Sequence, residues 1–275
     1  NPSAAESEDS EFNSNLADFV DEDELNSLGE KLISEYTGDR DSRKDWEETY
    51  TKGLDQLGLK IEERTAPWAG ACGVFHPMLT EAVIRFQSQS ISEMFPAQGP
   101  VRTKIVGKMT DDKEKQAKRV EDYLNYLLTH EMSEYRTETE KMLFSLPLAG
   151  SAFRKVYYDH SMGRPCSLFV PAEDVVVNYG ASDLTTCERI THVMRKSGNN
   201  IRKMQVSGFY RDIELPKPEN QRSEVDRKYD ELTGETHTFN YDDRHTVLEM
   251  LVDLDLEGFE DTDETGQQTG IALPY

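Results

Sequence analysis

The sequence predicts an α+β protein in which long amphipathic helices come first and an antiparallel, β-rich part follows. Apolar residues recur at helical spacing from about residue 23 to residue 149, and after Gly150 they occur in short β-rich runs separated by turn residues. Both ends are acidic. We therefore expect an acidic flexible arm over residues 1–22 and a helical region over 23–149. A β-rich region over 150–275 should hold two short helices and an acidic hairpin, and should continue beyond the last residue.

The charge is concentrated at the two ends of the chain. The 275 residues are 36% hydrophobic and carry a net charge of -22, which predicts exposed arms or a large polar surface around the core. Residues 1–50 hold 16 acids and 4 bases, and residues 241–275 hold 10 acids and 1 base. Such ends repel nucleic-acid phosphates and suit basic partners, or they simply keep the protein soluble.

Neither a membrane span nor a disulfide framework is expected. No apolar run approaches the roughly 18 residues of a membrane helix, and the start does not resemble a signal peptide. The three cysteines are scattered, which favours a reducing compartment. The sequence thus predicts a soluble, intracellular protein. The cysteines are Cys72, Cys166 and Cys187.

Two amphipathic helices open the helical region. The first begins at Asp23 with acids in its first turn, where the helix dipole favours them, and is expected to end at Gly38. The second runs from about Asp41 to Gly58. Its apolar face consists of Trp46, Tyr50, Leu54 and Leu57.

A proline- and glycine-containing loop over residues 66–77 separates these helices from the next one. Pro77 is expected at the first helical position, and the helix that follows is apolar around much of its circumference as far as Phe95. The run from Val101 to Val106 is a strand candidate.

Two further helices precede Gly150. Asp111 and Glu114 resemble an acidic capping box, which would open a long helix, and another helix covers about residues 136–147. The long helix is expected to turn Ala117, Val120, Leu124, Leu127 and Leu128 inward.

The β-rich part has the pattern of a meander. Turn residues such as 161–164 separate its runs, and helices over about 199–209 and 219–231 interrupt them. A last strand is expected over residues 246–258, leading into the acidic tail. The earlier runs are 151–159, 166–171, 174–178 and 189–197.

Cys72 and His76 stand four positions apart and allow three readings: a reactive pair, half of a metal site, or the start of a helix. A thiolate nucleophile needs a base and an electropositive, partly exposed setting, yet no cysteine-protease signature surrounds the pair. Our interpretation is a small buried thiol at Cys72 and a helix-capping imidazole at His76, and a Cys/His-dependent enzyme is the alternative. The six histidines lack zinc-binding spacing, so no metal site is predicted.

Residues 253–264 match a calcium-loop pattern in part. Against this reading, the fifth position is a bulky Glu257, Glu260 occupies a position that is normally apolar, and the preceding segment alternates like a strand. A solvated acidic hairpin and a calcium-responsive binding module therefore both stay open. The matching residues are Asp253, Asp255, Glu257, Gly258, Asp261 and Glu264.

The sequence contains no recognisable active site. It has no phosphate-binding loop, no dinucleotide fingerprint and no nucleophile elbow. We therefore predict no catalytic, cofactor or metal site, and expect a scaffold rather than an enzyme. The bases Lys113, Lys115, Lys118 and Arg119 are interpreted as a solvated face. The aromatics Tyr123, Tyr126, Phe153, Tyr157 and Tyr158 are interpreted as core packing.

Several long blocks of sequence resemble the portal (head-to-tail connector) proteins of short-tailed bacteriophages. The resemblance covers nearly the whole chain after about residue 17 and rests on ordered blocks rather than on a short motif. The blocks are residues 45–103, beginning "DWEETYTKGLDQLGLKIEERTAPWAGACG", 146–159 ("LPLAGSAFRKVYYD"), 169–195 ("FVPAEDVVVNYGASDLTTCERITHVMR"), 208–212 ("GFYRD") and 253–275.

The resemblance implies a structural virion protein at the portal vertex of the capsid, made in the host cytoplasm. It implies a closed homo-oligomeric ring, usually a dodecamer, through which double-stranded DNA passes non-specifically during packaging and ejection. The partners implied are the major capsid protein, the terminase and the tail adaptor proteins, with no membrane and no cofactor. Portals are usually longer, so the chain resembles mainly the wing portion, and we assign no residues to the DNA tunnel or to the terminase-binding clip.

Overall fold

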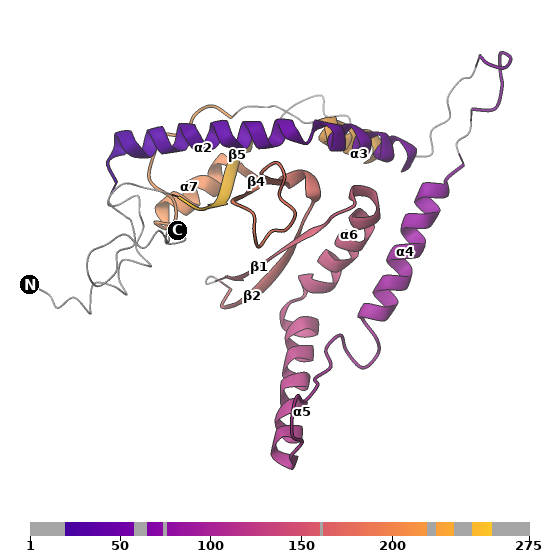
Figure 1. Ribbon diagram of the computed structural model, residues 1–275, viewed down its shortest axis with the longest axis vertical. Coiled ribbons are helices and arrows are strands. Elements are labelled where there is room, and N and C mark those ends of the chain that lie inside the picture. Colours follow the sequence, from indigo (N-terminus) through magenta and orange to yellow (C-terminus); the bar gives the residue numbers. More distant parts are fainter. Residues whose placement is uncertain are drawn as a thin grey trace, which may run out of the picture. The chain divides into compact units, whose positions relative to one another are not determined.

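The α+β prediction is confirmed by the computed structural model (Figure 1). Its described part contains seven α-helices and two antiparallel sheets, one of two strands and one of three. The chain divides into two compact units, which are described separately. Unit 1 combines residues 1–45, 175–220 and 241–275, and unit 2 combines 46–174 and 221–240. The structure describes residues 20–57, 65–73, 76–159, 162–218, 224–233 and 244–254.

Unit 1 is built on the three-stranded sheet. Its strand order is β3 (Val175–Val177), β4 (Arg189–Ser197) and β5 (Arg244–Val252), with β4 in the centre and both pairings antiparallel. Helix α2 (Glu22–Ser42) contacts β3, and helix α7 (Gly198–Val206) follows β4 directly. The three predicted strands are thus present, although β5 ends at Val252 and the described residues 253 and 254 that follow it, predicted to continue the strand, do not.

The prediction that the first helix ends at Gly38 is wrong, because α2 continues to Ser42. Asp39, which follows Gly38, is buried and accepts a hydrogen bond from Nε of Arg189 on β4 at 2.7 Å. The other arm of this guanidinium contacts Glu35. Just past the helix end, Arg43 donates to the backbone oxygen of Val175 at 2.9 Å. These contacts to the sheet hold the last turn in place despite the glycine.

Unit 2 is mostly helical and contains the β1–β2 hairpin. Helix α4 packs on α6, and α6 also packs on β2 (Figure 1). The helices are α3 (Lys44–Leu57), α4 (Met78–Met94), α5 (Asp111–Tyr126), the π-helical turn η2 (Leu127–Glu131), α6 (Glu134–Ala149), the short η3 (Ala172–Asp174) and α8 (Glu224–Thr233). The strands are β1 (Phe153–Asp159) and β2 (Arg164–Val170).

The core of unit 2 forms where α3 meets α6, η3 and α8. As predicted from its apolar face, α3 buries Tyr50 and Leu54, which cluster with Ala149, Ala172 and Val225. The hydroxyl groups of Tyr50 and Tyr229 lie 2.7 Å apart, and burial raises the pKa of both phenols. An ion pair of 3.0 Å between Lys228 and Asp55 adds a second link, so the core holds α8 against α3.

The free edge of β2 is covered by acidic side chains of α6. The backbone amide of Phe169 donates to the Glu138 carboxylate at 2.8 Å. One turn earlier, Glu134 accepts a 2.7 Å hydrogen bond from Arg164, and this guanidinium lowers the pKa of the Glu134 carboxyl. The helix therefore supplies hydrogen-bond acceptors that a further strand would otherwise provide.

The strand predicted over residues 101–106 is absent from the described structure, where this segment is extended but pairs with a helix. The Asn125 side chain accepts a hydrogen bond from the Val101 amide at 2.9 Å and donates one to the Val101 oxygen at 3.1 Å. The Thr103 amide donates to Glu121 at 3.1 Å, and this contact is the largest cause of a lowered pKa of the Glu121 carboxyl. Side chains of α5 thus satisfy backbone groups that a strand partner would have satisfied.

Two predictions about helix starts are corrected. The N-cap of α5 is Thr110 rather than Asp111, and no side-chain hydrogen bond caps the helix, so Asp111 and Glu114 form no capping box. Pro77 is the N-cap residue of α4, one position before the first helical residue. The end of α6 is as expected, because Gly150 adopts a left-handed φ of 79° at its C-cap.

Candidate functional site

Cys72 and His76 do not form a bonded pair in the described part of the chain. Both residues are exposed, and no hydrogen bond joins their side chains there. The interpretation of Cys72 as a buried thiol is therefore wrong, whereas Cys166 is buried. His76 is not a capping side chain either, since only its backbone oxygen, 2.8 Å from the Met78 amide, is bonded at the start of α4.

The described residues bring together no group of three histidine, cysteine or acidic side chains that would suit a metal ion. The calcium-loop pattern is not tested by this observation. Only Asp253 and Leu254 of the segment 253–264 lie within the described residues. Asp253 there follows β5, and its amide lies 3.4 Å from the backbone oxygen of Glu188.

Exposed apolar side chains on α5 form the first candidate surface, in unit 2. None of the 16 residues of α5 is buried. The predicted inward position of Val120 and the predicted core role of the tyrosines are both wrong, because Val120, Tyr123 and Tyr126 are 44%, 62% and 50% exposed. Tyr126 also stacks on His130 and donates a 2.6 Å hydrogen bond to Glu131. We call Val120, Tyr123 and Tyr126 the α5 surface.

The predicted solvated face of α5 is confirmed beside this surface. Lys118 and Asp122 are exposed to solvent and pair at 3.1 Å, and Lys118 also pairs at 3.0 Å with the partly buried Glu121. The bases are thus balanced by acids on the same helix, and they do not form a positive strip of the kind that grips phosphates. The apolar side chains, rather than the charges, distinguish this helix.

Aromatic side chains of the hairpin are exposed as well. Tyr157 and Tyr158 on β1 were expected in the core but are 37% and 54% exposed, and the neighbouring Val156 is 67% exposed. Only Phe153 of the hairpin aromatics packs against the buried cluster, as expected. Unit 2 therefore exposes apolar groups on both a helix and a strand.

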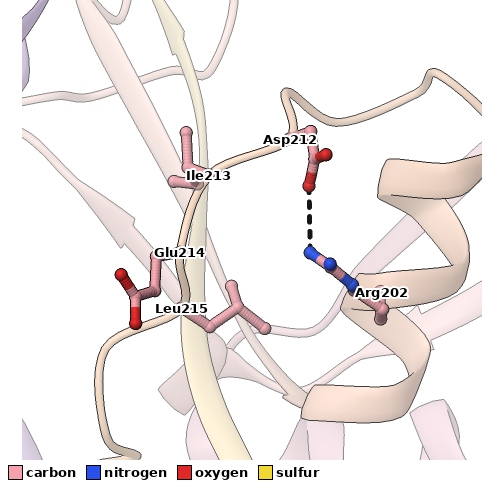
Figure 2. Close-up of a pocket in the computed structure, with 5 residues that line it drawn as sticks. All are labelled: Arg202, Asp212, Ile213, Glu214 and Leu215. Carbon is pink, nitrogen blue, oxygen red and sulfur yellow. Dashed lines mark hydrogen bonds and ion pairs between the residues drawn. The ribbon is translucent and has the colours of Figure 1, made fainter.

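A second candidate surface lies in unit 1, around a shallow hollow beside α7. Figure 2 shows Arg202 and Asp212 pointing toward each other, with their charged groups 2.9 Å apart, while Glu214 points away from Arg202. The hollow has a volume of about 440 Å³ and is completed by Ile213 and Leu215. None of the five residues that line it is buried.

A comparable hollow in unit 2 follows the C-terminal end of α4. It measures about 460 Å³ and lies between the Phe95–Arg102 segment and Tyr135. The rings of Phe95 and Tyr135 meet edge to face, and Arg136 and Arg154 approach one ring each. These aromatic and cationic groups already contact one another, so the hollow is a packed junction of helices.

Comparison with known proteins adds no family to this description. No protein-family model matches the chain, and no curated protein gives a significant match. Within the ranges that the structure describes, no helix is both long enough and apolar enough to cross a membrane.

The exposed side chains of α5 have the same helical spacing in the sequence as a buried face would have, so spacing alone does not distinguish the two. Tyr123 and Tyr126 are three positions apart, as residues on one helical face are, and that spacing is the same for a core face and for a face that meets another subunit. The small number of apolar residues in α5 is the more informative signal, because so few apolar side chains favour a helix that lies mostly at the surface.

Proposed function

We propose that this chain is a structural subunit of a bacteriophage portal, assembled as a homo-oligomeric ring at one vertex of the capsid. The ring would conduct double-stranded DNA during packaging and ejection, and would provide a docking platform for the terminase, the tail adaptor proteins and the major capsid protein. The sequence blocks that resemble portal proteins suggest this function, and the α5 surface supports it.

The α5 surface is the observation that carries the proposal. A soluble helix normally buries one apolar face, yet α5 buries none of its residues within the described chain and exposes two tyrosines and a valine together. Contiguous exposed apolar groups of this kind are typical of protein interfaces. Burial of each large side chain between subunits would contribute about 1–3 kcal/mol.

A ring closed by rotation requires two different complementary surfaces on each subunit. The exposed surfaces of α5 and α7 differ in composition, since the first is aromatic with balanced charge and the second lies in a basic segment. The acidic ends would also suit a conduit, because they offer DNA few lysines or arginines to bind.

The test is the mass and the shape of the purified full-length protein. Light scattering should give a mass many times that of one chain, and negative-stain microscopy should show closed rings with a central hole. Tyr123→Glu should shift the protein toward monomers. Tyr179→Glu makes the same change at an exposed tyrosine of unit 1 and should leave the rings intact. A wild-type protein that stays monomeric at all concentrations and with its capsid partners would contradict the proposal.

The enzyme alternative makes a different prediction in light of the structure. Since Cys72 is exposed, its alkylation alone no longer distinguishes an enzyme from a structural protein. Only an activity that is lost when Cys72 is alkylated, and also in His76→Ala, would favour a Cys/His-dependent enzyme.

A further inference from the structure

The C-terminal end of α7 exposes three apolar side chains next to two cationic ones. Val206, Phe209 and Ile213 are 84%, 73% and 54% exposed. Lys203, one turn before Val206, and Arg211, between Phe209 and Ile213, are exposed as well, and their side chains make no hydrogen bond or ion pair in the described part of the chain. We call these five residues the α7 patch.

The backbone of the α7 patch is fixed by hydrogen bonds. The amides of Phe209 and Tyr210 both donate to the Met204 oxygen, at 3.0 and 3.2 Å, which folds the chain back on the end of α7. The buried Gln205 donates to the backbone oxygens of Arg211 and Ile213 at 3.0 and 2.9 Å. The apolar groups are therefore held at the surface by ordered backbone, which lowers the entropy cost of binding a partner.

The hollow of Figure 2 lies directly beside these residues and shares Ile213 with the patch. Its volume of about 440 Å³ corresponds to more than ten water molecules at about 30 Å³ each, so it has room for an apolar side chain. The patch thus offers exposed apolar groups, a hollow and unpaired positive charge in one place.

The charge of this region is opposite to that of the whole chain. Residues 195–217 contain six bases and two acids, in a protein of net charge -22. Residues 1–19 are complementary, since they contain five acids and no base. They also carry three large apolar residues at spacings of four and three, namely Phe12, Leu16 and Phe19.

We propose that the α7 patch binds the acidic segment 6–19 of a second copy of this chain. Phe12, Leu16 and Phe19 would cover the exposed apolar groups of the patch, and the acids around them would pair with Lys203 and Arg211. This inference rests on the proposed function to the extent that a ring gives every subunit a neighbour. It names one pair of complementary surfaces for that contact.

Photocrosslinking of the full chain tests the contact. Benzoylphenylalanine is placed at position 12, the protein is irradiated, and the products are separated on a denaturing gel and digested for mass spectrometry. A crosslink within one chain leaves the chain mass unchanged, whereas a crosslink between copies gives a dimer band. We expect a dimer band whose crosslinks map to residues 203–215. The absence of a dimer band, or crosslinks that map elsewhere, would overturn the inference.

A charge reversal gives the matched control. Lys203→Glu should lower the dimer yield about fivefold, the effect of losing one exposed ion pair, and Arg211→Glu should do the same. Lys104→Glu makes the same change at an exposed lysine of unit 2 and should leave the yield unchanged. Equal yields in the Lys203 and Lys104 variants would overturn the role assigned to the patch.

The outcomes separate this inference from the proposed function. Rings whose arm crosslinks map outside the patch would leave the portal proposal standing and refute the arm contact. Dimer crosslinks into the patch without any ring would support the arm contact and count against the portal proposal.

Discussion

The hydroxyl pair of Tyr50 and Tyr229 gives the sharpest test of how unit 2 is held together. These groups lie 2.7 Å apart in the core that joins α3 to α8, and Tyr50 is only 2% exposed. Replacing either residue with phenylalanine removes the hydrogen bond and keeps the ring. Each single change should lower the free energy of unfolding by about 1–2 kcal/mol. The double variant should cost about 1 kcal/mol less than the sum, because both changes remove the same bond.

The pH dependence of stability follows from the same pair. Burial raises the pKa of both phenols above the ordinary value of 10.0, so the folded protein keeps protons that the unfolded chain loses. Stability is therefore fully present below about pH 10 and decreases above it, by up to about 1.4 kcal/mol per pH unit for each such tyrosine. The double phenylalanine variant should lose less stability than the wild type between about pH 9 and pH 11.

Trp46 provides the probe for these measurements. It stacks on Tyr50 with a centroid distance of 5.2 Å and donates a 3.0 Å hydrogen bond to the Ala149 oxygen, so its fluorescence reports on this core. Trp68 is 67% exposed and can be replaced by phenylalanine to leave one reporter. Urea unfolding is then followed in this background. Additive losses in the double variant, or an unchanged pH profile, would refute the reasoning.

Three other changes test separate features. Arg189→Met should destabilise α2 by about 2–4 kcal/mol, because it leaves the buried Asp39 without its cation, and the loss should appear as faster amide exchange in α2. As the control, Arg85→Met breaks only an exposed ion pair and should cost less than about 0.5 kcal/mol. Gly99→Ala should cost about 1–3 kcal/mol more than Gly107→Ala in thermal unfolding, since both glycines have positive φ but only at Gly99 would a Cβ collide with the Asn125 side chain. Equal losses would contradict the fit between Gly99 and α5. Cys72 should be alkylated at least about tenfold faster than the buried Cys166 when both are quantified by mass spectrometry, and similar rates would mean that the described burial is wrong.

Local patterns predicted the elements whose partners are close in sequence or whose apolar face is clear. The face of α3 with Tyr50 and Leu54 is buried as expected, and the short β-rich runs after Gly150 form the strands. The left-handed Gly150 ends α6 as expected, because no residue with a Cβ adopts that conformation as readily. In each case the local preference and the tertiary contacts favour the same structure.

The sequence could not predict features that depend on distant partners. Gly38 would end an isolated helix, but Arg189, about 150 positions away, stabilises the turn that follows it. The segment at Val101 has the composition of a strand, yet Asn125 supplies its hydrogen bonds. The exposure of Tyr123 and Tyr126 was missed for a similar reason, since their spacing does not say whether another part of the chain covers them.

The acidic residues on α6 also affect whether a further strand can pair with the β1–β2 hairpin. An edge strand whose amides are open can pair with any extended segment, and many copies held close together make such errors more frequent. The Phe169 amide already donates its hydrogen bond to the Glu138 carboxylate, so another strand would have to displace this charged group before it could pair there. The Glu138 carboxylate therefore protects this edge of the hairpin against pairing with a further extended segment.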